Sequence, residues 1–218
     1  RRIVGGNIFG RGKSISIQDL KKIISARSYI RKRKKNFFSI FIEANPNIIY
    51  EKKVYHSADI FFNIALTDND RLPLSIINLY LGGGGELSQS GSLFSDKHTK
   101  FQNNFLPVLG VSTDTFFKSL KKYICDSFKD YAVILRLNCE GVEDSVIYSA
   151  HACFEEKLEL ICGALKDVAE LKGVEAFNNL EKFISDNQIP FANFASPVST
   201  WAEGQNAIQD VLKKSKIT

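Results

Sequence analysis

Acidic turns follow short apolar runs at two places in the sequence, and these turns hold the residues best suited to chemistry. The run at residues 37–42 ends in Glu43, and the run at residues 131–137 leads into Asn138 and Glu140. Carboxylates accept hydrogen bonds from hydroxyl groups and repel phosphate. The turns therefore favour a ligand with sugar hydroxyls and positive charge over a nucleoside triphosphate.

Two further segments extend this candidate site. Asp68 follows the apolar run at residues 60–66, and the N-terminal segment contains Gly5, Gly6 and Asn7. In an open α/β sheet, ligands bind beyond the carboxyl ends of the strands, where backbone donors of loops and helix starts converge. We expect one such edge to carry all the residues of interest: Gly5, Gly6, Asn7, Glu43, Asp68 and the turn at 138–141.

The elements that must position these residues alternate along the chain. Apolar residues at helical spacing predict helices at residues 16–35, 115–128, 142–153, 174–187 and 203–214. Short apolar runs predict strands at residues 37–42, 60–66, 131–137, 158–162 and 189–194. Strands that alternate with helices pair in parallel through right-handed crossovers. The sequence therefore predicts an α/β fold with a doubly wound, mainly parallel sheet.

A single domain over residues 1–218 is expected. A chain of 218 residues is long enough for one sizeable core, and it shows neither an internal repeat nor a long polar linker. The segment at residues 82–104 begins with a glycine- and serine-rich stretch that cannot pack a core. We expect this segment to form a loop or hairpin insertion over the sheet edge.

Composition narrows the class of protein. No apolar run approaches the roughly 20 residues that cross a bilayer, so we expect a soluble, cytoplasmic protein without a membrane span. The four cysteines are scattered along the sequence, without the close spacing of zinc ligands. We therefore expect reduced thiols in the core and no metal site. The basic run at residues 31–35 is better explained as a solvated helix end than as a nucleic-acid site, because no aromatic residues are interleaved with it. A homo-oligomer is compatible with this composition.

Two histidines are weaker candidates for a chemical role. His151 is expected on the helix after Glu140, as a surface or core residue away from the strand edge. His98 lies in a polar loop, from which it would reach a substrate only if that loop acts as a lid.

Five motifs occur in order between residues 37 and 150. They are Glu43-Ala44-Asn45-Pro46 after the first strand, the Asn-Ile-Ala-Leu-Thr-Asp stretch at 63–68, the Gly/Ser-rich segment at 82–93, the Ser-Thr-Asp-Thr-Phe element at 112–116, and the Arg-Leu-Asn-Cys-Glu-Gly-Val-Glu element at 136–143. In this order they resemble the FkbM family of methyltransferases, whose corresponding motifs include Glu-Pro-Asn-Pro and Lys-x-Asp-x-Glu-Gly-x-Glu. Ala44 stands in place of the first proline of the former.

The resemblance implies a Rossmann-like class I methyltransferase fold that binds S-adenosylmethionine. Glu43 would accept hydrogen bonds from the ribose hydroxyls of this cofactor, and Asp68 would lie near its adenine. The other residues implied to bind the cofactor are Gly5, Gly6, Asn7 and Asn45.

The resemblance also implies the catalytic residues. Asn138, Glu140 and Glu143 would face the methyl donor and the acceptor hydroxyl, with Glu140 as the candidate base. Glu143 fits equally well as an acid at the start of a helix, where it would interact favourably with the helix dipole.

Two positions depart from the family pattern. Ile3 stands where the first strand should carry an acid, and Asn138 stands where the family has aspartate. An amide can orient a hydroxyl, but it cannot take its proton at neutral pH. Despite these departures, the resemblance implies an O-methyltransferase that acts on a sugar hydroxyl of a glycan or glycosylated metabolite. The alternatives are a non-catalytic methyltransferase-like binding module and a nucleic-acid methyltransferase.

Overall fold

The computed structural model describes residues 2–5, 37–51, 58–70, 72–83, 91–101 and 103–193. Several sequence predictions fall outside these described residues: the helices at 16–35 and 203–214, the basic run at 31–35, and Gly6 and Asn7.

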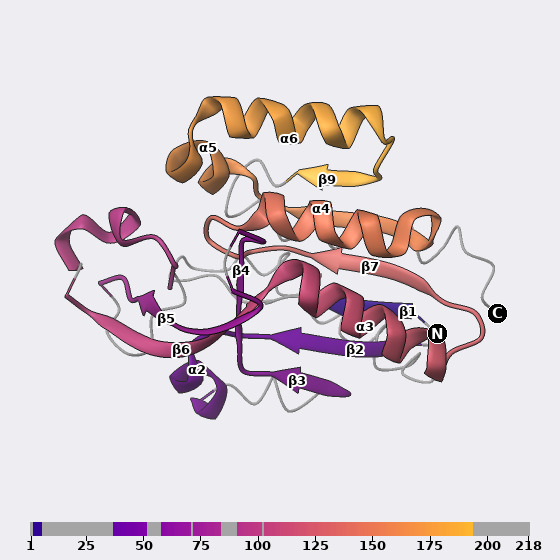
Figure 1. The fold of residues 1–218 in the computed structure, drawn as a ribbon, viewed down its shortest axis with the longest axis horizontal. Helices are drawn as coiled ribbons and strands as arrows, with labels where there is room; N and C mark the ends of the chain where they lie inside the picture. Colours follow the sequence, from indigo (N-terminus) through magenta and orange to yellow (C-terminus); the bar gives the residue numbers. More distant parts are fainter. Residues whose placement is uncertain are drawn as a thin grey trace, which may run out of the picture.

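The larger of two sheets is wholly parallel. Its six strands lie in the order β3-β2-β1-β7-β8-β9 (Figure 1), and every neighbouring pair runs in the same direction. The strands are β1 (Arg2–Gly5), β2 (Phe37–Ile42), β3 (Ile60–Phe62), β7 (Ala132–Arg136), β8 (Leu158–Gly163) and β9 (Phe191–Asn193). The prediction of a mixed α/β chain with a mainly parallel sheet is confirmed.

The apolar runs form strands whose side chains are buried on both faces of the sheet. Ile40 and Phe41, which point to opposite faces of β2, are both buried, and β8 is buried at five of its six positions. Strands in parallel sheets carry near-continuous apolar runs for this reason. The run at residues 158–162 could therefore be recognised as a strand from composition alone.

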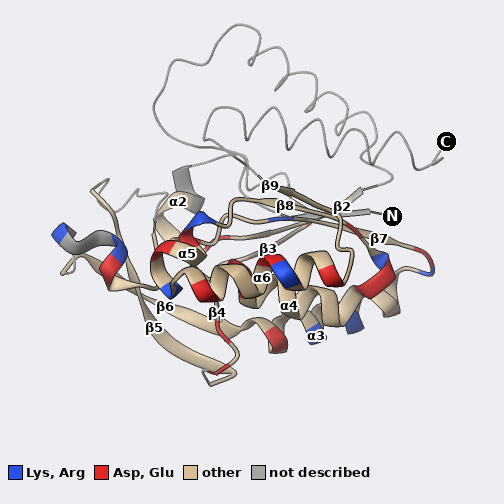
Figure 2. Cartoon of the chain, turned by 90° about the horizontal axis from the view of Figure 1, so that it is seen from above, with Lys and Arg blue, Asp and Glu red and all other residues tan. Residues whose placement is uncertain are grey.

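Helices cover one face of the sheet in the described part of the chain. Figure 2 shows α3 (Thr113–Ser127), α4 (Glu143–Phe154) and α6 (Val174–Asp186) on that face. These helices confirm the predictions at 115–128, 142–153 and 174–187 to within a few residues. The shorter elements are α2 (Pro46–Glu51), η4 (Ser95–Phe101), η5 (Glu155–Lys157) and α5 (Lys166–Lys172).

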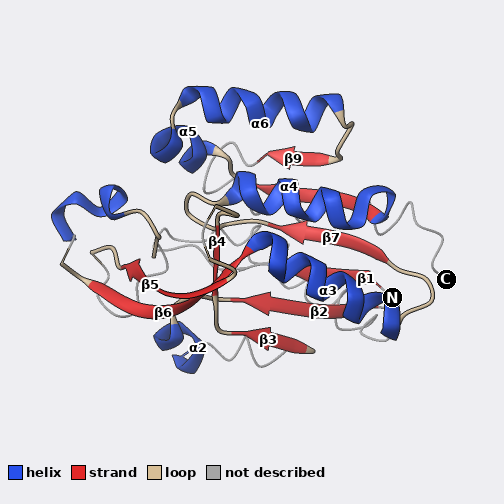
Figure 3. Cartoon of the chain, in the orientation of Figure 1, coloured by secondary structure: helices blue, strands red, loops and turns tan. Residues whose placement is uncertain are grey.

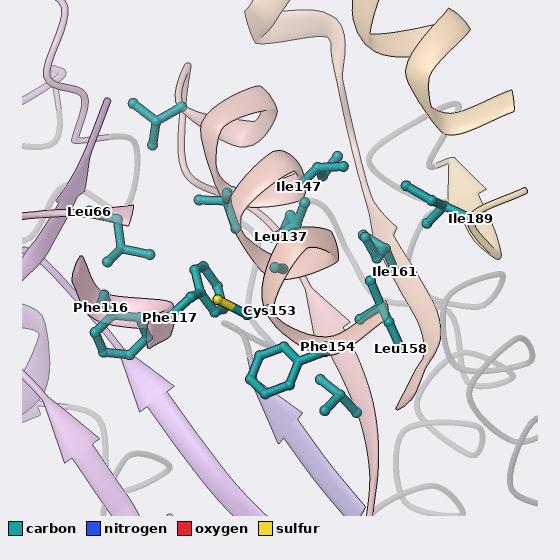
Figure 4. Close-up of a cluster of buried hydrophobic side chains, with 14 of the residues drawn as sticks. Leu66, Phe116, Phe117, Leu137, Ile147, Cys153, Phe154, Leu158, Ile161 and Ile189 are labelled. Carbon is teal, nitrogen blue, oxygen red and sulfur yellow. The ribbon is translucent and has the colours of Figure 1, made fainter. Parts of the chain in front are cut away.

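The main core lies between the parallel sheet and these helices. Phe116 and Phe117 of α3 contact each other edge to face, and Phe117 meets Phe154 of α4 in the same way (Figure 4). Ile147 and Ile161 are fully buried between α4 and β8. Burial of one large apolar side chain contributes about 1.5–3 kcal/mol, so this cluster fixes α3 and α4 on the sheet.

The predicted strand at residues 60–66 is wrong in one respect, because it is two strands in two sheets. The side-chain amide of Asn63 donates to the carbonyl oxygens of Glu43 (2.8 Å) and Ala44 (3.2 Å). These bonds tie the chain to the end of β2 after β3 has ended. The next residues form β4 (Ala65–Thr67), which pairs in parallel with β6 (Phe105–Ser112).

The second sheet was not anticipated from the sequence. It has the order β4-β6-β5 (Figure 3), in which β5 (Leu74–Tyr80) and β6 pair antiparallel. The expected insertion at residues 82–104 is thus the connection of a longer hairpin that spans residues 74–112.

In the ranges that the structure describes, no helix is both long and apolar enough to cross a bilayer.

We predict that Gly163→Ala destabilises the fold by about 1–3 kcal/mol, the usual cost of overpacking a buried position. A Cβ atom at Gly163 would lie 2.8 Å from Cβ and 2.9 Å from the carbonyl oxygen of Leu137. The backbone at the end of β8 must therefore move away from the end of β7. Urea unfolding measures this change, and a variant as stable as the wild type would contradict the close approach.

Candidate functional site

A cavity of about 140 Å³ opens at the carboxyl edge of the parallel sheet. Glu43 and Ala44, which follow β2, line it together with Asn138 and Glu140, which follow β7. Its deeper wall is apolar and comes from β4 and from the face of α3 that carries Phe116, Phe117 and Leu120. The structure thus brings the two acidic turns to one cavity.

The cavity lies at the switch point of the sheet, where the order in which strands are added reverses. From β1 the chain adds β2 and β3 on one side, and after β6 it returns to the other side of β1, where it adds β7, β8 and β9. Ligands of open α/β sheets bind at such a switch point, beyond the carboxyl ends of the strands. Gly5 ends β1 beside Leu135 of β7, and it therefore lies at this edge.

Glu43 is held in place by the turn that follows it. Its Oε1 accepts a hydrogen bond from the backbone N–H of Asn45 at 3.0 Å, and its own N–H donates to the carbonyl of Phe62 at 3.1 Å. Asn45 is buried, and its Oδ1 accepts from the N–H of Asn47 at 3.0 Å. Asn45 does not line the cavity, so its contacts support the turn.

The turn after β7 is organised by Glu143. The carboxylate of Glu143 accepts hydrogen bonds from the backbone N–H groups of Cys139 (2.9 Å), Glu140 (2.8 Å) and Gly141 (2.8 Å). The turn needs this support because Glu140 and Gly141 have positive φ angles of 59° and 123°. Of the two positions expected for Glu143, the structure places it at the start of α4, where its side chain lies outside the cavity lining.

Glu140 points into a buried group of charges. Its carboxylate pairs with Lys97 of η4, whose Nζ also lies 2.8 Å from Oδ1 of Asp167 in α5. Burial alone lowers the pKa of Lys97, but the charge of Glu140 and the bond to Asp167 raise it above its usual value. Lys97 therefore remains an ammonium at neutral pH, and the candidate base forms an ion pair.

Sequence reasoning missed Lys97 and Asp167. Neither residue lies in a motif, and they reach Glu140 from two different parts of the chain. Ser92 strengthens the same contact, because its hydroxyl donates to the carbonyl of Glu140 at 2.7 Å. A Cβ atom at Gly141 would lie 2.9 Å from the ring of Phe94. Residues 91–97 are thus held against the turn at the cavity mouth.

Asp68 is not brought to the cavity. Its Oδ1 accepts from Ser145 of α4 at 2.6 Å and lies 2.7 Å from Nζ of Lys172 in α5. Lys172 also pairs with Asp144 at 2.7 Å. Burial lowers the pKa of Lys172, but its bonds to Asp144 and Asp68 raise it overall. Asp68 therefore ties the loop after β4 to α4 and α5.

The structure describes the side chain of only one of the two histidines considered above, His151. His151 lies on α4 with its ring 5.3 Å from that of Phe183, away from the cavity lining. His98 belongs to η4, but its side chain lies outside the described residues. Within the part of the chain that the structure covers, no three His, Cys, Asp or Glu side chains gather closely enough to hold a metal ion.

Comparisons with protein-family models, curated proteins and solved structures found no match for this chain.

We predict that Lys97→Met lowers the free energy of unfolding by about 3–5 kcal/mol, because breaking a buried ion pair leaves the partner charge uncompensated. Glu140 and Asp167 would then face each other without the ammonium between them. Urea unfolding at pH 7 measures the loss.

Lys118→Met is the matched control for this prediction. Lys118 pairs with Asp114 at 2.6 Å on α3, but both side chains are exposed, and exposed pairs contribute little. The control should change stability far less than Lys97→Met. Equal effects of the two variants would contradict the central position of Lys97.

We predict that Glu143→Gln flattens the pH dependence of stability between about pH 4.5 and 7. Burial raises the pKa of Glu143 from 4.5 to about 7, although its bonds to backbone N–H groups act in the opposite direction. An acid with a raised pKa binds its proton more tightly in the folded state. Its stabilising contribution is complete below pH 4.5 and is lost as the pH rises through about 7.

The shift corresponds to at most about 3 kcal/mol between the two ends of this pH range. Glutamine cannot ionise, so the variant should lack this part of the pH dependence. Unfolding free energies of both proteins at pH 5 and pH 8 give the comparison. Identical pH profiles would show that Glu143 does not titrate in this range.

Proposed function

We propose that the chain is an S-adenosylmethionine-dependent O-methyltransferase with a Rossmann-like class I fold, acting on a sugar hydroxyl of a glycan or glycosylated metabolite. One observation carries the proposal: Glu43 and Glu140, from the ends of two strands that flank β1, line one cavity at the switch point of the sheet. The motif resemblance supports the cofactor and the substrate class. The strand order matches the order 3-2-1-4-5-6 of dinucleotide-binding sheets.

The residues of the cavity suit a nucleoside with a positive charge. Glu43 lines the cavity with a carboxylate, the group that accepts hydrogen bonds from ribose hydroxyls. Glu140 adds a second carboxylate at the mouth, and the wall from Phe116 to Leu120 offers an apolar surface for a base. When bound, the cofactor would supply the activated methyl group.

The turn after β7 would position the acceptor. Asn138 and Glu140 both line the cavity, so the amide can orient the hydroxyl and the carboxylate can accept its proton. Much of the rate of a methyl transfer can come from holding the nucleophile in line with the methyl group. In this proposal the bonds from Glu143 to the turn serve that alignment.

The same turn also supports a second candidate, a methyltransferase-like binding module without catalysis. Of the three residues expected to be catalytic, Asn138 is an amide, Glu140 is paired with Lys97, and Glu143 is bonded to the turn. The carboxylate of Glu140 is therefore already engaged by an ammonium group. Such a site would bind a nucleoside more readily than it would take a proton.

We predict that the protein binds S-adenosylhomocysteine in the micromolar range and that Glu43→Gln weakens binding at least ten-fold, or about 1.4 kcal/mol. The amide retains the shape of the side chain but has fewer acceptor sites for hydroxyls. Isothermal titration calorimetry measures both dissociation constants.

Glu181→Gln is the control. Glu181 is exposed on α6, so its substitution removes the same charge far from the cavity. No binding to the wild type, or equal binding by Glu43→Gln and Glu181→Gln, would contradict the proposal. Transfer of labelled methyl groups to carbohydrate acceptors then separates the two candidates. Binding without any transfer would favour the module over the enzyme.

A further inference from the structure

The cavity extends from the acidic turns into the main core. Along β7 its lining runs from Glu140, after the strand, back to Val133, the second residue of the strand. On the helices it reaches Ile124, in the last turn of α3, and Phe154, the last residue of α4. Because α4 connects the parallel strands β7 and β8, it runs back from the carboxyl edge of the sheet. Ile124, Val133 and Phe154 thus mark an inner end of the cavity, opposite Glu140.

The inner end is closed to solvent. Ile124, Val133 and Phe154 are 0%, 4% and 3% exposed, and Ile40 and Phe117, which also line the cavity, are buried. Figure 4 shows the rings of Phe117 and Phe154, which contact each other edge to face. A group bound at the inner end is therefore surrounded by side chains rather than by water.

The lining is polar at the mouth and apolar at the inner end. Among the described residues, the charged and amide side chains of the lining are Glu43, Arg136, Asn138 and Glu140. All four lie at the carboxyl end of β2 or β7 or in the turn that follows. In the described part of the chain, the inner end is lined by hydrocarbon side chains alone, so it offers a ligand no side-chain hydrogen bond.

The volume of the cavity suits a small hydrocarbon group. At about 140 Å³ it is close to the roughly 150 Å³ of an engineered cavity, lined by Leu, Ile and Phe, that stays dry and binds benzene. An empty apolar cavity destabilises a fold in proportion to its volume. A hydrocarbon group at the inner end would bury its own apolar surface and also remove this cost.

A nucleobase suits the inner end less well. Its ring nitrogens accept hydrogen bonds, and burying them without partners is costly. The base of the proposed cofactor fits better against Phe116, which lies in the first turn of α3 and thus closer to the acidic turns. The inner end is therefore left for a different part of a ligand.

We infer that the inner end of the cavity binds an uncharged hydrocarbon group of about six carbon atoms, the apolar part of a ligand whose polar part stays at the acidic turns. This first step depends on the cavity alone. A second step rests on the proposed function. The acceptor is then a sugar linked to an apolar aglycone, with its hydroxyls near Asn138 and Glu140, and not a polysaccharide.

Benzene and pyrimidine are matched probes for the first step, because they share one shape and differ by two ring nitrogens. With the whole chain and no cofactor, benzene at ten times its Kd should raise the Tm by about 3–6 °C. Pyrimidine should bind at least ten-fold more weakly, because its nitrogens would be buried without donors. Differential scanning calorimetry measures the Tm.

Methyl resonances in NMR spectra locate the bound probe. Benzene should shift the methyl signals of Ile124 and Val133, and their titration gives the Kd. The methyl signals of Leu72, which is 71% exposed and lies outside the lining, should stay unchanged. This measurement uses the wild type and therefore does not depend on how any variant folds.

Leu120→Phe tests the position by filling the space. Leu120 is half-buried on α3 and lines the cavity one turn before Ile124. The larger ring should occupy part of the inner end and raise the Kd for benzene at least ten-fold, because overpacked positions do not accept a further group. Leu72→Phe makes the same exchange at an exposed position, so it should bind benzene like the wild type.

Two glucosides test the second step. Phenyl glucoside should bind at least ten-fold more tightly than methyl glucoside and should displace benzene, because its phenyl group gains burial that the methyl group cannot provide. Isothermal titration calorimetry measures both dissociation constants. Equal binding of the two glucosides would overturn this step.

Three outcomes would overturn the first step. They are an unchanged Tm with benzene, pyrimidine that binds as tightly as benzene, or methyl shifts confined to residues outside the cavity. Titration with S-adenosylhomocysteine separates these failures from that of the proposed function. A protein that binds benzene but not S-adenosylhomocysteine would keep the hydrocarbon site and contradict the methyltransferase.

Discussion

The carboxylate of Glu143 is the constraint on which the candidate site depends. It holds three consecutive backbone N–H groups, and through them it fixes a turn in which Glu140 and Gly141 take left-handed conformations. Without these bonds, buried donors would lack partners and the strained turn would relax. The direction of the Glu140 side chain, and with it the shape of the cavity mouth, follows from this one buried carboxylate.

Much of the parallel sheet could be predicted, because its strands are continuous apolar runs buried on both faces. The antiparallel hairpin could not be predicted in the same way. β5 alternates between exposed and covered positions, and Pro107 and Gly110 argue against a strand in β6. Pro107 is tolerated because it lies opposite Asn78, whose backbone groups point away from β6, so no ladder bond is lost.

Only part of the candidate site could be predicted from the sequence. Glu43 and Glu140 follow strands of one parallel sheet, so topology alone predicts a shared edge. Lys97, Asp167 and Lys172 come from segments without any motif, and only the fold brings them to the acidic residues. Burial lowers the pKa of Lys97 and of Lys172, but the carboxylates around them raise it overall, and local sequence does not encode this balance. A sequence pattern could therefore identify the acids but not the ammonium groups that pair with them.

The hairpin of β5 and β6 contributes to the cavity through one of its two faces. Leu79 of β5 lines the cavity from the inner face, while the residues on either side of it in the strand alternate toward the outer face. β6 continues directly into α3, whose first turn is tied to Asn69 through the backbone N–H of Asp114 at 2.8 Å. The hairpin therefore joins the apolar wall of the cavity to the start of α3, so that one segment of the chain positions both.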